Sequence, residues 1–262
     1  MVEEERRMSR ILAFVYGVVC YVISLCAFLY AIGFVANVLV PKSIDSPPAA
    51  RLGQALLVDA LLLGIFAVQH SVMARQWFKS AWTRLVPPPI ERSTFVLFTS
   101  LALLLLFWKW EPMGGVVWNV EKPAARIILQ GLSLAGWVIV LISTFLINHF
   151  DLFGLRQVYL HLKGREYTPV RFKKSVFYNY VRHPLYFGLV LAFWATPSMT
   201  VAHLVFALAM TGYILIGIRL EERDLLHLHG GAYQAYRNQV SMLFPWLPKK
   251  KSLQAGPSTQ RG

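Results

Sequence analysis

The sequence predicts an all-α fold, a polytopic bundle of transmembrane helices with about five to six spans and a short C-terminal helical hairpin. Two observations support this prediction. Of the 262 residues, 56% are hydrophobic and only 15% are charged, which is more apolar than an ordinary soluble domain. The apolar residues also gather in long runs, most of them long enough to cross the hydrocarbon core of a bilayer. We therefore expect an integral membrane protein that forms a single domain over residues 1–262.

Four of these runs are clear spans, at residues 11–40, 52–73, 93–109 and 125–148. The region 184–220 has room for two helices only if both are short, and Pro197 and Ser198 supply the break between them. A leg of about thirteen residues rises only about 20 Å, which is less than the roughly 30 Å hydrocarbon core. We expect a tilted or incompletely spanning hairpin there, and a flexible tail at 249–262.

Lysine and arginine residues predict the orientation. In chain order, the segments outside the apolar runs hold 3, 2, 4, 3, 7 and 7 of them. Alternate segments therefore carry 3, 4, 7 and 7 against 2 and 3, and the positive-inside rule places both termini in the cytoplasm. The net charge of +13 comes from these segments and not from a basic face on a soluble domain. We accordingly expect the lipid bilayer, and not nucleic acid, as a partner.

Polar clusters stand at the cytoplasmic ends of four apolar runs. They are residues 69–71, 148–151, 182–184 and 221–224. Histidines, carboxylates and arginines that converge at one depth from separate helices are what a site for a charged, water-soluble cosubstrate requires. The histidines lack the spacing of metal ligands, so we expect no metal.

The C-terminal third of the chain carries a two-part motif. Its first part reads RHPLYFG at 182–188, and its second reads EERDL at 221–225 followed by GAYQAY at 231–236. The motif resembles the C-terminal signature of the isoprenylcysteine carboxyl methyltransferase superfamily, which includes phospholipid N-methyltransferases and NnrU-like proteins. The stretch NHFDLFGLRQVYLHL at 148–162 further resembles the bacterial methanethiol S-methyltransferases. The resemblance implies a methyltransferase of the bacterial inner membrane that binds S-adenosylmethionine through residues of about 178–247.

The residues that would bind this cofactor have suitable chemistry. Arg182 can bind the cofactor carboxylate with two donors, and Pro184 starts a helix whose free N–H groups face the ligand. Gly188 allows close approach of the backbone, while the acids and tyrosines suit the ribose, the ammonium group and the adenine. Taken singly, Arg182 could also be a membrane anchor, the tyrosines interfacial residues and the acids a solvated helix end. The full predicted set is Tyr180, Arg182, His183, Pro184, Tyr186, Gly188, Glu221, Glu222, Tyr233 and Tyr236.

Methylation of a small thiol is the predicted reaction, and the resemblance favours methanethiol, which gives dimethyl sulfide. The enzyme must then ionise the thiol beside the cationic cofactor. His70 and His149 are the candidate bases, and Asp151 or Asp59 would orient one of them. Other roles stay open for these residues: Asp59 could make a hydrogen bond between helices, and His149 and Asp151 could pack a loop.

Two other functions remain open from the sequence. One is methylation of a lipid, either a prenylated cysteine carboxylate or phosphatidylethanolamine, which would need a side opening between spans. The other is a small transporter in which Asp59, His70 and His149 form a polar path, although most of the polar residues cluster at one edge of the bilayer. A small thiol predicts a small pocket ringed by aromatic side chains such as Phe150 and Trp194.

Overall fold

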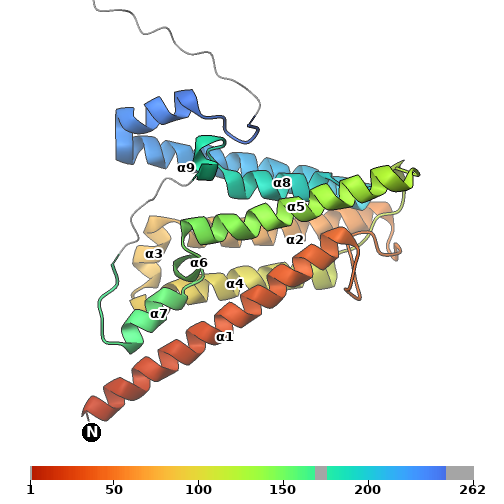
Figure 1. Ribbon diagram of the computed structural model, residues 1–262. Coiled ribbons are helices and arrows are strands. Elements are labelled where there is room, and N and C mark those ends of the chain that lie inside the picture. The colour runs from red at the N-terminus through yellow and green to blue at the C-terminus, as the bar shows by residue number, and fades with distance from the viewer. Residues whose placement is uncertain (1, 169–175, 246–262) are drawn as a thin grey trace, which may run out of the picture.

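The computed structural model describes residues 2–168 and 176–245 and is almost wholly helical (Figure 1), which confirms the predicted all-α class. The tail predicted at 249–262 lies outside the described residues. In chain order the elements are α1 (Val2–Ala36), α2 (Leu52–Met73), α3 (Gln76–Trp82), α4 (Pro88–Lys109), β1 (Val116–Asn119), α5 (Pro123–Ile147), α6 (His149–Leu152), α7 (Leu155–Leu162), the 3-10 helix η1 (Val176–Asn179), α8 (Pro184–Trp194), β2 (Ser198–Thr200) and α9 (Val201–Gln239).

Among the described residues, five helices are long and apolar enough to cross a membrane: α1, α2, α4, α5 and the first part of α9, Val201–Leu228. Their apolar side chains point outward as well as inward. In α2, Leu57, Leu61, Ile65 and Val68 are 49% to 63% exposed and form a stripe at helical spacing. Water would disfavour such a stripe, whereas lipid tails solvate it well. The chain is therefore an integral membrane protein.

The last two helices differ in length from the predicted pair of short legs. α8 has 11 residues, but α9 has 39. The break between them lies where Pro197 predicts it, and there β2 pairs antiparallel with β1. The sequence predicts that the helix ends near Glu221, but α9 continues, because a charged helix is stable in water beyond the bilayer. It changes direction at Gly230, whose φ of 53° lies in the left-handed region (Figure 1).

Two glycines let α5 and α8 pack at close distance. A Cβ atom added at Gly136 would lie 2.6 Å from the carbonyl oxygen of Gly188. One added at Gly188 would lie 2.7 Å from the carbonyl oxygen of Gly136. Side-chain carbons do not approach backbone so closely, so both positions need glycine here. The sequence predicts that Gly188 approaches a ligand, whereas the structure places it against α5.

The long helices alternate in direction, so their connections gather at two ends of the bundle. α3, α6 and α7 lie at the end that carries the N-terminus, and β1 and β2 lie at the opposite end (Figure 1). α2 and α5 therefore end at the N-terminal end, and α4 and α8 begin there. The four polar clusters of the sequence share this end of the bundle, as the pattern of apolar runs predicts.

The aromatic core lies toward the opposite end. Phe34, near the end of α1, meets Trp110, just after α4, with ring centroids 5.8 Å apart. Trp110 in turn meets Phe206, near the start of α9, at 5.8 Å. Large rings thus fill the bundle at the end that carries β1 and β2, and a hollow can form at the N-terminal end.

Candidate active site

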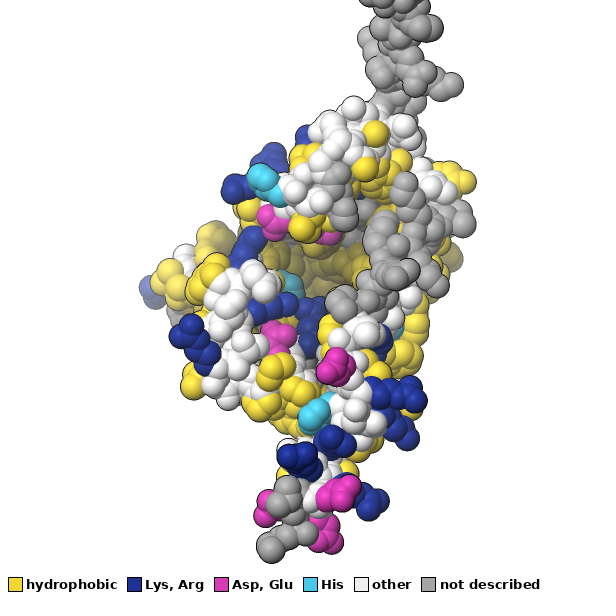
Figure 2. All heavy atoms as spheres, turned by 90° about the vertical axis from the view of Figure 1, so that its left-hand side faces the viewer, with side chains coloured by type: hydrophobic (Ala, Val, Ile, Leu, Met, Phe, Trp, Pro, Cys, Tyr) yellow, Lys and Arg dark blue, Asp and Glu magenta, His cyan; other side chains and the backbone are white. Residues whose placement is uncertain are grey.

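A cavity of about 1420 Å³ opens at the N-terminal end of the bundle. Figure 2 views this end and shows the hollow with charged side chains around it. Its lining comes from two parts of the chain, residues 10–167, which we call the α4 wall, and residues 178–236, which we call the α9 wall. The predicted site residues that line the cavity are Asp151, Arg182, His183, Pro184, Tyr186, Glu221, Tyr233 and Tyr236.

Arg182 is buried and bonds mainly to the protein itself. Its Nε and Nη2 atoms both lie 2.7 Å from Oε1 of Glu222. Its Nη1 donates to the backbone carbonyls of Arg237, at 3.0 Å, and Val240. All three guanidinium nitrogens therefore have protein acceptors. The two-donor bond to a cofactor carboxylate that the sequence predicts for Arg182 would compete with these contacts.

His183 and the backbone complete this connection, which we call the Arg182–Glu222 clamp. Nε2 of His183 lies 3.2 Å from Oε1 of Glu222. The backbone N–H groups of Arg182 and His183 donate to the carbonyl oxygens of Ser241 and Met242, at 2.9 and 3.2 Å. The clamp therefore joins the start of α8 to α9 and to the segment that follows it.

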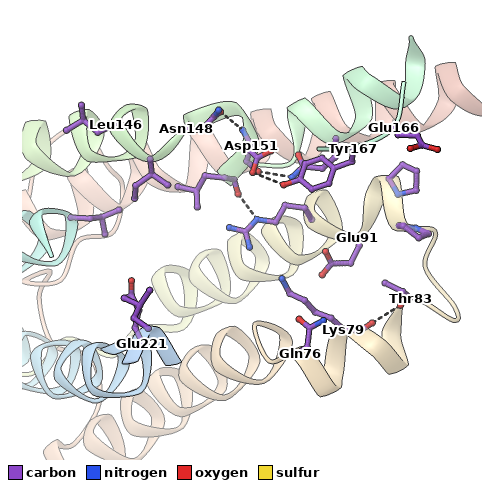
Figure 3. A pocket seen from close by; sticks show the side chains of 18 of the residues that line it. Gln76, Lys79, Thr83, Glu91, Leu146, Asn148, Asp151, Glu166, Tyr167 and Glu221 are labelled. Carbon is purple, nitrogen blue, oxygen red and sulfur yellow. Dashed lines mark hydrogen bonds between the residues drawn. The ribbon is translucent and has the colours of Figure 1, made fainter. Parts of the chain in front are cut away.

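The α9 wall presents other side chains to a ligand. Glu221 reaches the cavity from α9 (Figure 3), and its carboxylate lies 3.8 Å from Nδ1 of His183. The rings of Tyr233 and Tyr236 are 5.9 Å apart, and the Tyr236 hydroxyl donates to the backbone carbonyl of Tyr178 at 2.7 Å. Burial is the main reason that the pKa of both Tyr233 and Tyr236 rises to about 12, so both phenols are neutral.

Three of the predicted cofactor residues lie away from the cavity. The Tyr180 residue is 63% exposed, Gly188 packs on α5, and Glu222 belongs to the clamp. These three are not among the described residues that line the cavity. The motif therefore contains both structural and cavity-lining positions.

The α4 wall is organised around Asn148, whose φ of 136° lies in the left-handed region. Its side-chain oxygen accepts from the backbone N–H of Asp151 at 3.1 Å and caps α6 (Figure 3). The Asp151 carboxylate accepts from Arg156 at 3.0 Å and from the Tyr167 hydroxyl at 3.2 Å. Arg156 also donates to the backbone oxygen of Thr168 at 2.7 Å, which fixes the segment that carries Tyr167.

Arg92, near the start of α4, supplies a cation on the same wall. Its Nε donates to the backbone oxygen of Leu152 at 2.7 Å, and its guanidinium lies 4.9 Å from the centre of the Phe95 ring. Among the described residues, its two Nη groups have no hydrogen-bond or ion-pair partner. In the sequence, Arg92 is one of several basic residues between two apolar runs, and Tyr167 is a lone tyrosine in a polar connection, so neither pattern indicates a site.

The two histidines predicted as bases are held in packing contacts. The ring nitrogens of His149 lie 2.8 Å from the Thr144 hydroxyl and 3.0 Å from the Tyr21 hydroxyl. Burial lowers the pKa of His149 below its ordinary value. Nδ1 of His70 lies 3.2 Å from the Thr99 hydroxyl. Neither histidine is among the described residues that line the cavity.

Asp59 lies toward the opposite end of the bundle. It is fully buried, and its Oδ1 accepts from the backbone N–H of Glu111 at 2.8 Å. The aromatic residues in the described cavity lining are tyrosines, and neither Phe150, which is 53% exposed, nor Trp194, which donates to Thr211 at 3.0 Å, is among them. The prediction of a small pocket ringed by these two side chains is wrong.

The chain is similar to named proteins along most of its length. It is 58% identical to methanethiol S-methyltransferase of Crocosphaera subtropica, over 93% of this chain and 95% of that protein. It is 56% identical to methanethiol S-methyltransferase of Mycobacterium tuberculosis, over 91% of this chain and 98% of that protein. Nurim of Mus musculus is 31% identical over 66% of this chain and 69% of nurim, while neither a protein-family model nor a solved structure matches. Identity of this extent over nearly the whole length confirms the resemblance: the chain belongs to the methanethiol S-methyltransferase family.

Proposed function

We propose that this protein transfers a methyl group from S-adenosylmethionine to methanethiol and releases dimethyl sulfide. The observation that carries the proposal is the 58% identity with a methanethiol S-methyltransferase. A shared fold alone would not indicate a substrate. Here the alignment covers 93% of the chain, so little of either cavity wall falls outside it.

The cavity fits this cofactor in size and in chemistry. Its volume of about 1420 Å³ exceeds the roughly 300–1,000 Å³ of sites for drug-sized ligands, so donor and acceptor have room together. Glu221 and His183 suit the ribose hydroxyls or the ammonium group, and Tyr233 and Tyr236 suit the adenine ring. The first turn of α8, with Pro184 at its first position, offers free N–H groups to the carboxylate.

When bound, S-adenosylmethionine supplies a methyl group on a cationic sulfur, whose S–CH₃ bond breaks as the sulfur of the acceptor forms a new bond to that carbon. The chain's own residues must remove the proton of the thiol, because a thiolate is far more nucleophilic than a thiol. Of the two predicted bases, His70 and His149, and the two acids predicted to orient them, Asp151 is the one found among the described residues that line the cavity. We therefore assign the proton to Asp151 in preference to His70, His149 or Asp59.

Asp151 alone does not make this ionisation favourable. A carboxylate is a weak base for this step, because a thiol ordinarily holds its proton more tightly than a carboxylic acid does. One cation about 4 Å from the thiolate returns about 4 kcal/mol at an effective dielectric constant of 20. A second cation close to the thiolate would add a stabilisation of the same order.

We also propose that the N-terminal end of the bundle faces the cytoplasm and that the protein lies in the bacterial inner membrane as one domain. By sequence, one set of alternating segments, which includes the N-terminal one, carries 3, 4, 7 and 7 basic residues, and the other set carries 2 and 3. A cytoplasmic opening also suits a cosubstrate that is dissolved in water. The cofactor segment would then be the α9 wall, within residues 178–247.

The test incubates purified protein with labelled S-adenosylmethionine and, separately, methanethiol, a prenylcysteine analogue and phosphatidylethanolamine. We expect labelled dimethyl sulfide from the first acceptor and no labelled product from the lipids. Glu221→Gln should weaken the binding of S-adenosylhomocysteine about tenfold, while Glu121→Gln at the opposite end should not. Methyl transfer to a lipid alone would overturn the proposed substrate.

A further inference from the structure

Two further polar side chains lie beside Asp151. Arg92 and Tyr167 both line the cavity with it. The Tyr167 hydroxyl donates to Oδ2 of Asp151 at 3.2 Å, so the Tyr167 oxygen keeps lone pairs for a donor from the cavity. Arg92 is close enough to interact electrostatically with both Asp151 and Tyr167. An acid, a phenol and a cation thus meet on the α4 wall.

Contacts within the protein hold these groups in place. Arg156 bonds to Asp151, and its guanidinium lies 5.3 Å from the centre of the Tyr167 ring. The bond from Nε of Arg92 to the backbone of Leu152 fixes that guanidinium and leaves its Nη groups without partners among the described residues. Groups that are fixed in advance stabilise a developing charge without the cost of reorganisation.

We propose that Tyr167, Asp151 and Arg92 together activate the thiol: Tyr167 relays its proton to Asp151, and the Nη groups of Arg92 bind the thiolate. The inference rests on the proposed function, because it supposes a thiol acceptor. It adds two residues that the sequence did not indicate, and Arg92 supplies a cation besides that of the cofactor.

The proton transfer balances as follows. The S–H bond of the thiol breaks, and its electron pair stays on sulfur. The proton binds the Tyr167 oxygen as the proton of Tyr167 moves to Oδ2 of Asp151. Tyr167 ends unchanged, Asp151 ends neutral, and the thiolate carries the negative charge next to Arg92. Burial and the carboxylate of Asp151 raise the pKa of Tyr167, so at neutral pH this phenol can relay a proton but cannot serve as a free base.

Two other charged groups, Arg156 and Glu91, lie near these three residues, and their contributions must be distinguished from the proposed relay. Arg156 is already paired with Asp151 at 3.0 Å. Glu91 lines the cavity and interacts electrostatically with Arg92, so it is an alternative proton acceptor. A Glu91→Gln variant tests that alternative, and the relay predicts that it keeps the dependence on Tyr167.

The experiment compares two acceptors in the full-length protein. Methanethiol must lose a proton before it reacts, whereas methaneselenol is already ionised at neutral pH. Tyr167→Phe should lower kcat about 100-fold with methanethiol, a usual contribution of acid–base catalysis, and less than about fivefold with methaneselenol. Arg92→Met should lower kcat with both acceptors, because either anion needs the cation. Tyr159→Phe is the matched control, since Tyr159 is exposed on α7 and is not among the described cavity residues.

Binding provides a readout that does not depend on turnover. Tyr167→Phe should bind S-adenosylhomocysteine within about twofold of the unsubstituted protein, because Tyr167 faces the acceptor. If the unsubstituted protein makes no dimethyl sulfide, the proposed function fails. If it does, and Tyr167→Phe loses the same factor with both acceptors or with neither, the relay is wrong. An unchanged kcat in Arg92→Met would show that Arg92 does not bind the thiolate.

Discussion

Replacing Glu222 by glutamine should destabilise the N-terminal end of the bundle. The substitution keeps the shape of the side chain but removes the charge that faces Arg182, His183 and Arg237. The Arg182 side chain is only 4% exposed, so it would keep a buried charge with neutral acceptors alone. A buried charge without its counter-ion is strongly disfavoured.

The size of the effect follows from these contacts. Breaking one side of a buried ion pair costs about 3–5 kcal/mol. The contact with Arg237 is 3.5 Å long and that side chain is 41% exposed, so it adds less than about 1 kcal/mol. For a chain of this length each kcal/mol moves the melting temperature by about 2–4 °C, which gives an expected fall of about 6–20 °C.

Thermal unfolding in detergent measures this fall, with Glu221→Gln as the matched control. The neighbouring Glu221 side chain is 48% exposed and lines the cavity, so its replacement should move the melting temperature by less than about 3 °C. Its effect should instead be on the affinity for S-adenosylhomocysteine. If Glu222→Gln melts at the temperature of the unsubstituted protein, or if Glu221→Gln is the less stable of the two, the structural role of the clamp is refuted.

Three further outcomes are expected. Gly188→Ala should lower the melting temperature, because its Cβ would lie 2.7 Å from the backbone of Gly136. Gly131→Ala has open space and should not lower it. Equal melting temperatures for the two variants would contradict the close packing of α5 on α8. Asp59→Asn should keep the rate of methyl transfer within about threefold. A loss of 100-fold or more, the scale of a lost acid or base, would mean that Asp59 takes part in the reaction. Reporters inserted near Gly164 and fused after the C-terminus should both report the cytoplasm, and opposite sides would mean an odd number of crossings in α8 and α9.

Much of the bundle could be predicted from the sequence, because a bilayer requires long apolar runs. The run 52–73 coincides with α2, and 125–148 differs from α5 by one or two residues at each end. The length of α9 could not be predicted in the same way. Beyond the membrane, hydropathy no longer limits a helix, so the charged residues after Leu220 do not mark its end.

The site was only partly predictable for a different reason. Glu221 and Glu222 are chemically alike, but neighbouring residues on a helix point in different directions, and only the packing of α9 decides which one faces the cavity. The contacts of Asp151 with Tyr167, and of Arg92 with Leu152, join residues that the chain separates by 16 and 60 positions. Pattern and spacing carry no record of such contacts.

The clamp also bears on the order in which the molecule is completed during synthesis. Arg182 is synthesised before its acceptors, because Glu222 lies 40 residues downstream and Val240 lies 58 residues downstream. The preceding spans can insert into the membrane while this arginine still lacks its acceptors. The wall that we assign to the methyl donor is therefore finished only when the ribosome has passed the end of α9, and a chain that stops earlier would remain in the membrane with this wall incomplete.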